Sequence, residues 1–160
     1  MKHAVIRTDR LSGTIQSADL VSVKHMVDGV ATAIDNGNIV KLNGLMKGER
    51  EVFEGVVPAA SDRLEDVVVI ASVEVMYDET KRDLADYFNE EGKVCRGYYM
   101  RSGNIFSVTA EALESTPVVG DKVCLGDSTK LQVAGEGTPV GTIIAIDVVG
   151  RYTYYVIQVI

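Results

Sequence analysis

The sequence predicts a mainly β fold: a small β-barrel or sandwich of short hairpins, with one short helix and an extended N-terminal arm. Val, Ile, Thr and Tyr recur in short runs, which favours strands. Gly and Asn-Gly pairs separate these runs, and both tolerate the positive φ of tight hairpin turns. Regular strand–helix alternation is missing from the pattern, so a barrel or sandwich is favoured over a parallel α/β sheet.

The expected strands follow one another from residue 30 to the C-terminal end. They are placed at residues 30–34, 38–42, 52–57, 67–76, 94–100, 105–109, 122–125, 131–134, 141–149 and 152–159. In the last of these, apolar or aromatic side chains occupy both alternating sets of positions. Such a strand is either sandwiched centrally or has one face against a partner.

One segment has helical periodicity. Thr80 is placed to cap a helix over residues 81–88, with Asp83 three residues later in a capping-box position. Three large side chains then share one face at i, i+3 and i+4: Leu84, Tyr87 and Phe88. A shorter turn, capped by Thr109, is expected after Val108.

The N-terminal segment differs from the rest of the chain because its apolar residues are irregularly spaced. We therefore predict two parts, an arm at residues 1–27 and a single β-rich domain at residues 28–160. The arm would add a strand to another chain; the alternative is a loosely packed loop with one edge strand. The candidate partner contacts are Ile6, Leu11, Ile15, Leu20, Val21 and Val23 in the arm, with Tyr152 and Tyr154 in the last strand.

Composition and charge exclude several classes of protein. The apolar fraction is 46%, ordinary for a globular domain, and no run approaches the roughly 20 apolar residues of a membrane helix. The N-terminus lacks the layout of a signal peptide, so we expect synthesis in the cytoplasm. The net charge is −7, and residues 51–100 hold twelve acidic and five basic groups. Such an acidic centre disfavours nucleic-acid binding.

The residues that could carry chemistry do not form a recognised catalytic or metal-binding motif. Neither His3 nor His25 lies near a nucleophile in a known arrangement, and Cys95 and Cys124 are not in a C-x-x-C pair. The glycines at 135, 137 and 141 lack the spacing of a phosphate-binding loop. We therefore expect no enzyme activity, no cofactor and no metal. Whether the two cysteines pair is left open.

Three stretches of the second half of the chain form a recognisable pattern: the run from Phe88 to Thr109, then Pro117-Val-Val-Gly-Asp-Lys-Val, then Thr138-Pro-Val-Gly-Thr-Ile-Ile. This pattern resembles that of small β-rich decoration proteins of tailed-phage heads. In that family a strand leads into a Gly-Asn or Gly-Asp turn, a P-x-x-G-D turn precedes a further hairpin, and a G-T-x-V/I-G segment opens the last one. The resemblance covers roughly residues 88–159, with weaker support at 36–42.

The resemblance implies a non-enzymatic virion protein that binds the outside of the capsid and stabilises its lattice. Its partners would be the major capsid protein and further copies of itself, with a trimer favoured and a dimer or monomer also compatible. It would be made in the host cytoplasm. Two alternatives stay open: another phage structural subunit, from the tail or the head–tail connector, or a small β-barrel ligand-binding protein. The latter would have a pocket near Tyr98, Tyr99, Tyr154 and Tyr155.

Overall fold

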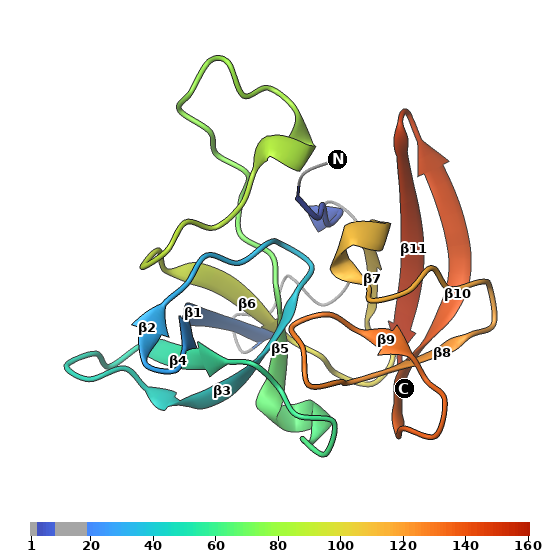
Figure 1. Cartoon of the computed structure of the whole chain (residues 1–160), viewed down its shortest axis with the longest axis horizontal. Helices are drawn as coiled ribbons and strands as arrows, with labels where there is room; N and C mark the ends of the chain where they lie inside the picture. Colours follow the sequence, from blue (N-terminus) through green and yellow to red (C-terminus); the bar gives the residue numbers. More distant parts are fainter. Residues whose placement is uncertain (1–2, 9–18) are drawn as a thin grey trace.

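Two β-sheets lie side by side in the computed structural model, which describes residues 3–8 and 19–160 (Figure 1). The mainly β fold with a small barrel is confirmed. The strands of the first sheet are β1 (Leu20–Val27), β2 (Val30–Ala31), β3 (Ile39–Leu45), β4 (Val52–Val56), β5 (Val67–Ile70) and β6 (Cys95–Tyr99). Those of the second are β7 (Ile105–Val108), β8 (Lys122–Cys124), β9 (Gln132–Val133), β10 (Pro139–Val149) and β11 (Tyr152–Val159).

The first sheet closes on itself to form a five-stranded barrel. Its order is β1-β4-β3-β5-β6, and an antiparallel pairing of β6 with β1 completes the circle. Strands β1 and β4 run parallel, from Ser22↔Val52 to His25↔Gly55, and the other barrel pairs are antiparallel. Closure leaves the barrel without an exposed strand edge, apart from the short β2 that pairs with the end of β1.

Small side chains fill the barrel. Its buried residues are Val23, Ile34, Val40, Val68, Ile70 and Cys95. Two glycines also face inward, and a Cβ added to Gly55 or Gly97 would lie 3.0 Å or less from a valine side chain inside the barrel. A barrel of five short strands encloses little volume, so valines and glycines suit it.

The second sheet is open and antiparallel, with the order β7-β11-β10-β8-β9. Strands β10 and β11 form its longest hairpin, which turns at Gly150 with φ +62°. Strand β11 lies between β7 and β10 and is buried on both faces, as its sequence predicted for a sandwiched strand.

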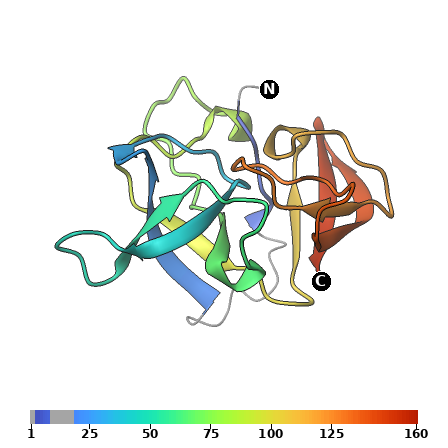
Figure 2. The same cartoon turned by 60° about the horizontal axis from the view of Figure 1, so that its bottom comes forward.

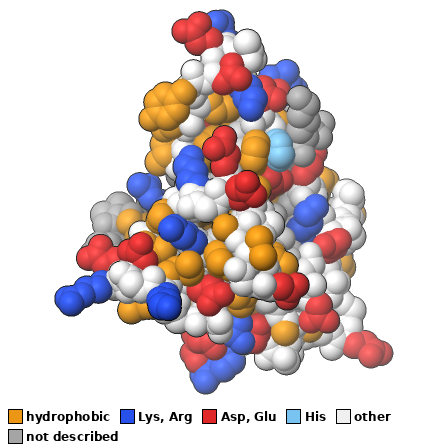
Figure 3. Space-filling model, turned by 60° about the vertical axis from the view of Figure 1, so that its left-hand side comes forward, with side chains coloured by type: hydrophobic (Ala, Val, Ile, Leu, Met, Phe, Trp, Pro, Cys, Tyr) orange, Lys and Arg blue, Asp and Glu red, His pale blue; other side chains and the backbone are white. Residues whose placement is uncertain are grey.

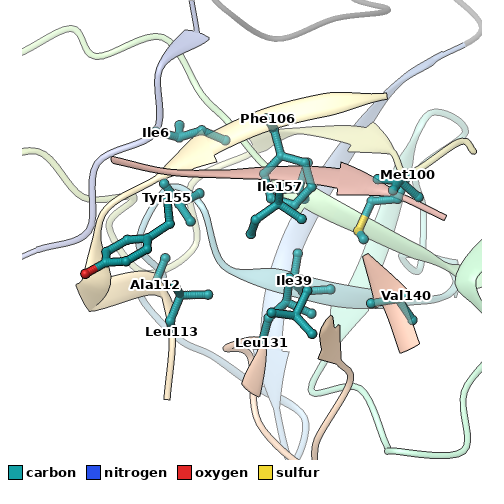
Figure 4. Packing of buried hydrophobic residues seen from close by; sticks show 14 of the residues in the cluster. Ile6, Ile39, Met100, Phe106, Ala112, Leu113, Leu131, Val140, Tyr155 and Ile157 are labelled. Atoms are coloured by element: carbon teal, nitrogen blue, oxygen red, sulfur yellow. The ribbon is translucent and has the colours of Figure 1, made fainter. Parts of the chain in front are cut away.

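The largest core fills the space between the outer wall of the barrel and the second sheet (Figure 4). Strand β5 divides the two cores: Val67 and Val69 face the second sheet, whereas Val68 and Ile70 face the barrel interior. A strand buried on both faces accounts for the continuous apolar run in this part of the sequence. Phe106 on β7 contributes the largest fully buried side chain.

Residues 3–8 run between the barrel and the second sheet (Figure 2). Ile6 forms an antiparallel bridge with Val108 at the edge of β7. The backbone N–H of Val5 donates to Thr109 Oγ1 at 3.1 Å, and the N–H of Thr109 donates to the Val5 carbonyl at 3.0 Å. This segment is therefore packed as part of the fold.

The predicted arm at residues 1–27 is wrong for the part that forms β1. Residues 20–27 are a barrel strand, paired with β4 on one side and β6 on the other. The sequence missed this strand because its partners are distant in the chain and only Val23 and His25 within it are buried. The division at residue 27 therefore separates β1 from its own barrel. Leu11 and Ile15 lie outside the described residues.

The predicted helix at residues 81–88 is replaced by a single 3₁₀ turn, η4 (Leu84–Asp86), capped by Asp83 rather than Thr80. The turn after Val108 is η5 (Ala110–Ala112), and a further turn, η3 (Leu64–Asp66), precedes β5. The strand predicted at residues 67–76 ends at Ile70. Among the described residues, no helix has the length and hydrophobicity to cross a membrane.

Candidate functional site

A surface groove of about 800 Å³ lies where strands β1 and β6 meet the start of the long segment between β5 and β6. It is the largest of the described hollows. A second hollow of about 520 Å³ shares four of its residues and continues under the same segment. The shared residues are Val75, Tyr77, Tyr87 and Lys93. Together the two hollows make one continuous surface, which we call the loop groove.

The long segment at residues 71–94, here the projecting loop, stands out from the barrel (Figure 1). Apart from the turn η4, it contains no helix or paired strand longer than a single bridge. Loops of this length inside compact domains are uncommon and are usually functional.

A buried polar network holds both ends of the projecting loop at its base. The Asn36 amide donates to the Ser72 carbonyl at 2.9 Å and accepts from the Ser72 N–H at 3.0 Å. The Asn89 amide donates to the Ile34 carbonyl at 3.1 Å and to Asn36 Oδ1 at 3.0 Å. The Tyr87 hydroxyl donates to Asn89 Oδ1 at 3.3 Å. Since buried, fully paired polar groups favour one conformation, this base is rigid.

The outer part of the projecting loop exposes apolar side chains in an alternating pattern. Val73, Val75 and Tyr77 are 54%, 49% and 94% exposed. Hydrophobic side chains lie on the upper, projecting part of the molecule and over the barrel below it, with charged side chains between them (Figure 3). A nearly fully exposed tyrosine beside two exposed valines is typical of a protein-contact surface.

The projecting loop is also strongly acidic. Residues 73–92 hold seven acidic and two basic side chains, so they contribute −5 of the chain's net charge of −7. Asp78 accepts hydrogen bonds from the backbone N–H and the hydroxyl of Thr80, at 3.0 and 2.7 Å, and these bonds lower the pKa of Asp78. Asp83 pairs with Arg151 at 2.8 Å, which connects the loop to the β10–β11 hairpin.

The two histidines and the two cysteines lie on different elements: His3 in the N-terminal segment, His25 on β1, Cys95 on β6 and Cys124 on β8. His3 Nδ1 is 2.9 Å from Asp35 Oδ1, and its ring stacks on Phe88. His25 is buried on β1. Both cysteines are free and buried, and burial raises the pKa of the Cys95 thiol to about 11. Within residues 3–8 and 19–160, no group of three or more His, Cys, Asp or Glu side chains is arranged to hold a metal ion.

Four of the six predicted partner contacts that the structure describes are buried in the chain itself. Ile6 and Val23 are 2% and 0% exposed, and Tyr152 and Tyr154 are 8% and 3% exposed. These four side chains are core residues, and a core side chain contacts a second protein only after local unfolding. Two others, Leu20 and Val21, are partly exposed and line the loop groove.

The comparisons with known proteins add no relative. No protein-family model, no curated protein and no solved structure matches the chain.

The four tyrosines expected around a ligand pocket do not meet in one cavity. Tyr98 and Tyr155 are buried in the core between the sheets, and Tyr154 packs with Val5 in a separate cluster. Tyr99 alone lines the loop groove. The residues missed by sequence reasoning are those of the projecting loop: Val73 and Val75 fall within the strand predicted at residues 67–76, and the sequence assigns no role to Tyr77.

Proposed function

We propose that the chain is a non-enzymatic structural protein of a tailed-phage particle, which binds the outside of the head and stabilises the capsid lattice. The observation that carries the proposal is the projecting loop, where Tyr77 is 94% exposed beside Val73 and Val75. The resemblance of residues 88–159 to capsid decoration proteins supports it independently. The proposed partner is the major capsid protein.

The loop has the two properties that a docking element needs. Its base is held by buried hydrogen bonds from Asn36 and Asn89, so little conformational entropy is lost when it binds. Its exposed tyrosine supplies the kind of aromatic anchor that dominates binding energy at interfaces. Because residues 73–92 carry a charge of −5, the complementary surface on the capsid would be basic.

On a repeated lattice, the contact made by each copy of the chain can be weak. Many identical sites close together raise the effective concentration of neighbouring copies, so modest contacts give a stable coat. A stiff body of two sheets around a shared core would resist deformation of the shell beneath it.

The test is cosedimentation of the purified chain with empty, expanded heads of the phage that encodes it. We expect saturable, stoichiometric binding to the heads, weaker binding at high salt, and no complex with unassembled capsid subunits. Absence of binding to expanded heads would contradict the proposal. Assembly of the free chain into rings would favour a tail or connector subunit instead.

Tyr77→Ala should weaken head binding by about 30-fold, the effect of an interface hot spot. Val118→Ala is the matched control, because Val118 is a 63% exposed side chain outside the loop groove. Both side chains make few contacts within the chain, so neither change should alter thermal unfolding. Equal binding by the two variants would exclude the loop as the contact.

A further inference from the structure

In the described part of the chain, the outer half of β10 has a strand edge that pairs with no other strand. Strand β8 pairs with β10 only at Pro139, Gly141 and Thr142, and the loop before β8 adds backbone bonds to Ile143. The last β8–β10 pair is Thr142↔Lys122, and the β10–β11 pairing has a register shift between Ile143 and Ala145. Beyond it, β11 pairs with residues 145–149 on one side, and no strand in the described part of the chain pairs with the other side. In Figure 1 this half of the hairpin extends beyond β8.

The free edge is apolar. Four side chains between residues 144 and 149 are strongly exposed: Ile144 at 40%, Ile146 at 39%, Val148 at 72% and Val149 at 45%. Proteins usually protect edge strands with lysines, prolines or short strand length, because an unpaired apolar edge binds another strand. Residues 144–149 contain no lysine or proline, and Asp147 is their one charged side chain.

The chain itself holds the hairpin in place. On one side, Tyr152 and Tyr154 pack with Val5 and Ala85, and Asp83 pairs with Arg151 near the turn. The outer half of the hairpin is therefore anchored to the rest of the fold through β11. The edge of β10 and its exposed side chains are left available, in an orientation fixed before any partner arrives.

We propose that residues 144–149 of β10 form a self-association site, where the same strand of a second copy pairs antiparallel across a two-fold axis. Each backbone edge would supply N–H and C=O groups to the other, and the second sheet would continue from one copy into the next. A two-fold axis brings the same patch together from both copies, so the isoleucines and valines would pack on one another.

The charge distribution of the chain favours a second copy as the partner that binds the edge of β10. Although the chain has a net charge of −7, residues 139–160 contain one acidic and one basic side chain, Asp147 and Arg151. Residues 73–92 of the projecting loop carry −5, so self-association through that loop would be opposed by repulsion. The hairpin is the neutral surface through which two copies can meet. This arrangement gives a dimer in place of the trimer that the family resemblance implies.

The first test is the solution mass of the full chain, measured by sedimentation velocity over a series of concentrations. We expect a concentration-dependent monomer–dimer equilibrium for the unmodified chain. The double variant Ile146→Lys, Val148→Lys should raise the dissociation constant at least 10-fold, because it places charges on the edge. The control Val30→Lys alters a 65% exposed valine on β2 and should leave the equilibrium unchanged.

A chain that is monomeric at every concentration would overturn the proposal, as would a double variant that dimerises like the unmodified chain. Circular dichroism of each variant shows whether the fold is kept. These outcomes are independent of head binding, because the proposed capsid contact lies on the projecting loop.

The second test locates the contact. Hydrogen exchange should slow with rising protein concentration at alternate residues within 144–149, because the amides that point away from β11 gain partners in the dimer. The amides of the loop groove should not change. A dimer whose protection appears outside residues 144–149 would overturn the assignment of the interface to β10.

Discussion

The barrel interior and the core between the two sheets are built from different kinds of side chain. The barrel interior is filled by valine, isoleucine and cysteine around inward-facing Gly55 and Gly97. The other core contains Tyr98 together with Phe106 and Tyr155, the last two of which are labelled in Figure 4. In the barrel, strand closure fixes the width and so limits the side chains, whereas the separation of two packed sheets adapts to the side chains between them. We therefore expect the first core to be sensitive to added volume and the second to lost volume.

The largest predicted effect is the removal of Phe106 from the core between the sheets. Phe106→Ala should lower the free energy of unfolding by about 3–5 kcal/mol, because the side chain is 2% exposed and its loss leaves a cavity. Urea unfolding followed by circular dichroism measures the change. Phe53→Ala, at a partly buried position lining the loop groove, is the control and should cost clearly less. Equal losses would mean that burial between the sheets does not set the cost of removing Phe106.

The complementary change adds volume to the barrel. The Cβ of Gly55→Ala would lie 2.5 Å from Val23 Cγ1 and 3.1 Å from Val40 Cγ2, so strands must move apart. We expect a loss of about 2 kcal/mol in the free energy of unfolding. Gly135→Ala is the control, since no atom lies within 4 Å of the added methyl group. A Gly55→Ala protein as stable as this control would show that the barrel can expand.

Much of the fold was predictable because its turns are local. The strand at residues 152–159 was placed with its observed bounds. The turns at Gly37, Gly103 and Gly150 have φ between +62° and +88°, as glycine-containing hairpin turns require. By contrast, β1 depends on a parallel pairing with β4 and an antiparallel pairing with β6, both distant in sequence. Its own residues carry too weak an alternation to indicate it.

The candidate site was harder to predict than the fold, because the type of a residue does not determine how exposed its side chain is. Tyr77 and Tyr154 are equally aromatic, yet one is 94% exposed and the other 3%. The difference arises because Asn36 and Asn89 hold the ends of the projecting loop, so that its middle stands clear of the barrel. A local sequence pattern does not indicate the hydrogen bond between Asn36 and Asn89, which lie 53 positions apart in the chain.

The smallest predicted effect on the free energy of unfolding comes from protonation of His25, which adds charge to the barrel instead of volume. His25 lies two residues from Val23 on β1, on the same inward face, and is 6% exposed. Burial lowers the pKa of His25 below its usual 6.5, although hydrogen bonds to the backbone at Thr32 and Ala33 oppose this. Its Nε2 is buried without a partner among the described residues. Protonation would therefore place an unpaired N–H and a charge inside the protein.

The sign of the pH effect follows from that lowered pKa. Below about pH 6.5 the unfolded chain binds a proton that the folded chain does not, so the free energy of unfolding falls as the pH decreases toward the folded-state pKa. Its slope is at most about 1.4 kcal/mol per pH unit. The free energy of unfolding is measured by urea unfolding between about pH 7.5 and about pH 5 for the unmodified chain and for His25→Gln. The difference between the two proteins isolates the titration of His25, because the carboxylates are common to both. If the free energies of the two proteins fall in parallel with pH, the barrel accommodates the imidazolium. The barrel would then be sensitive to added volume but not to added charge.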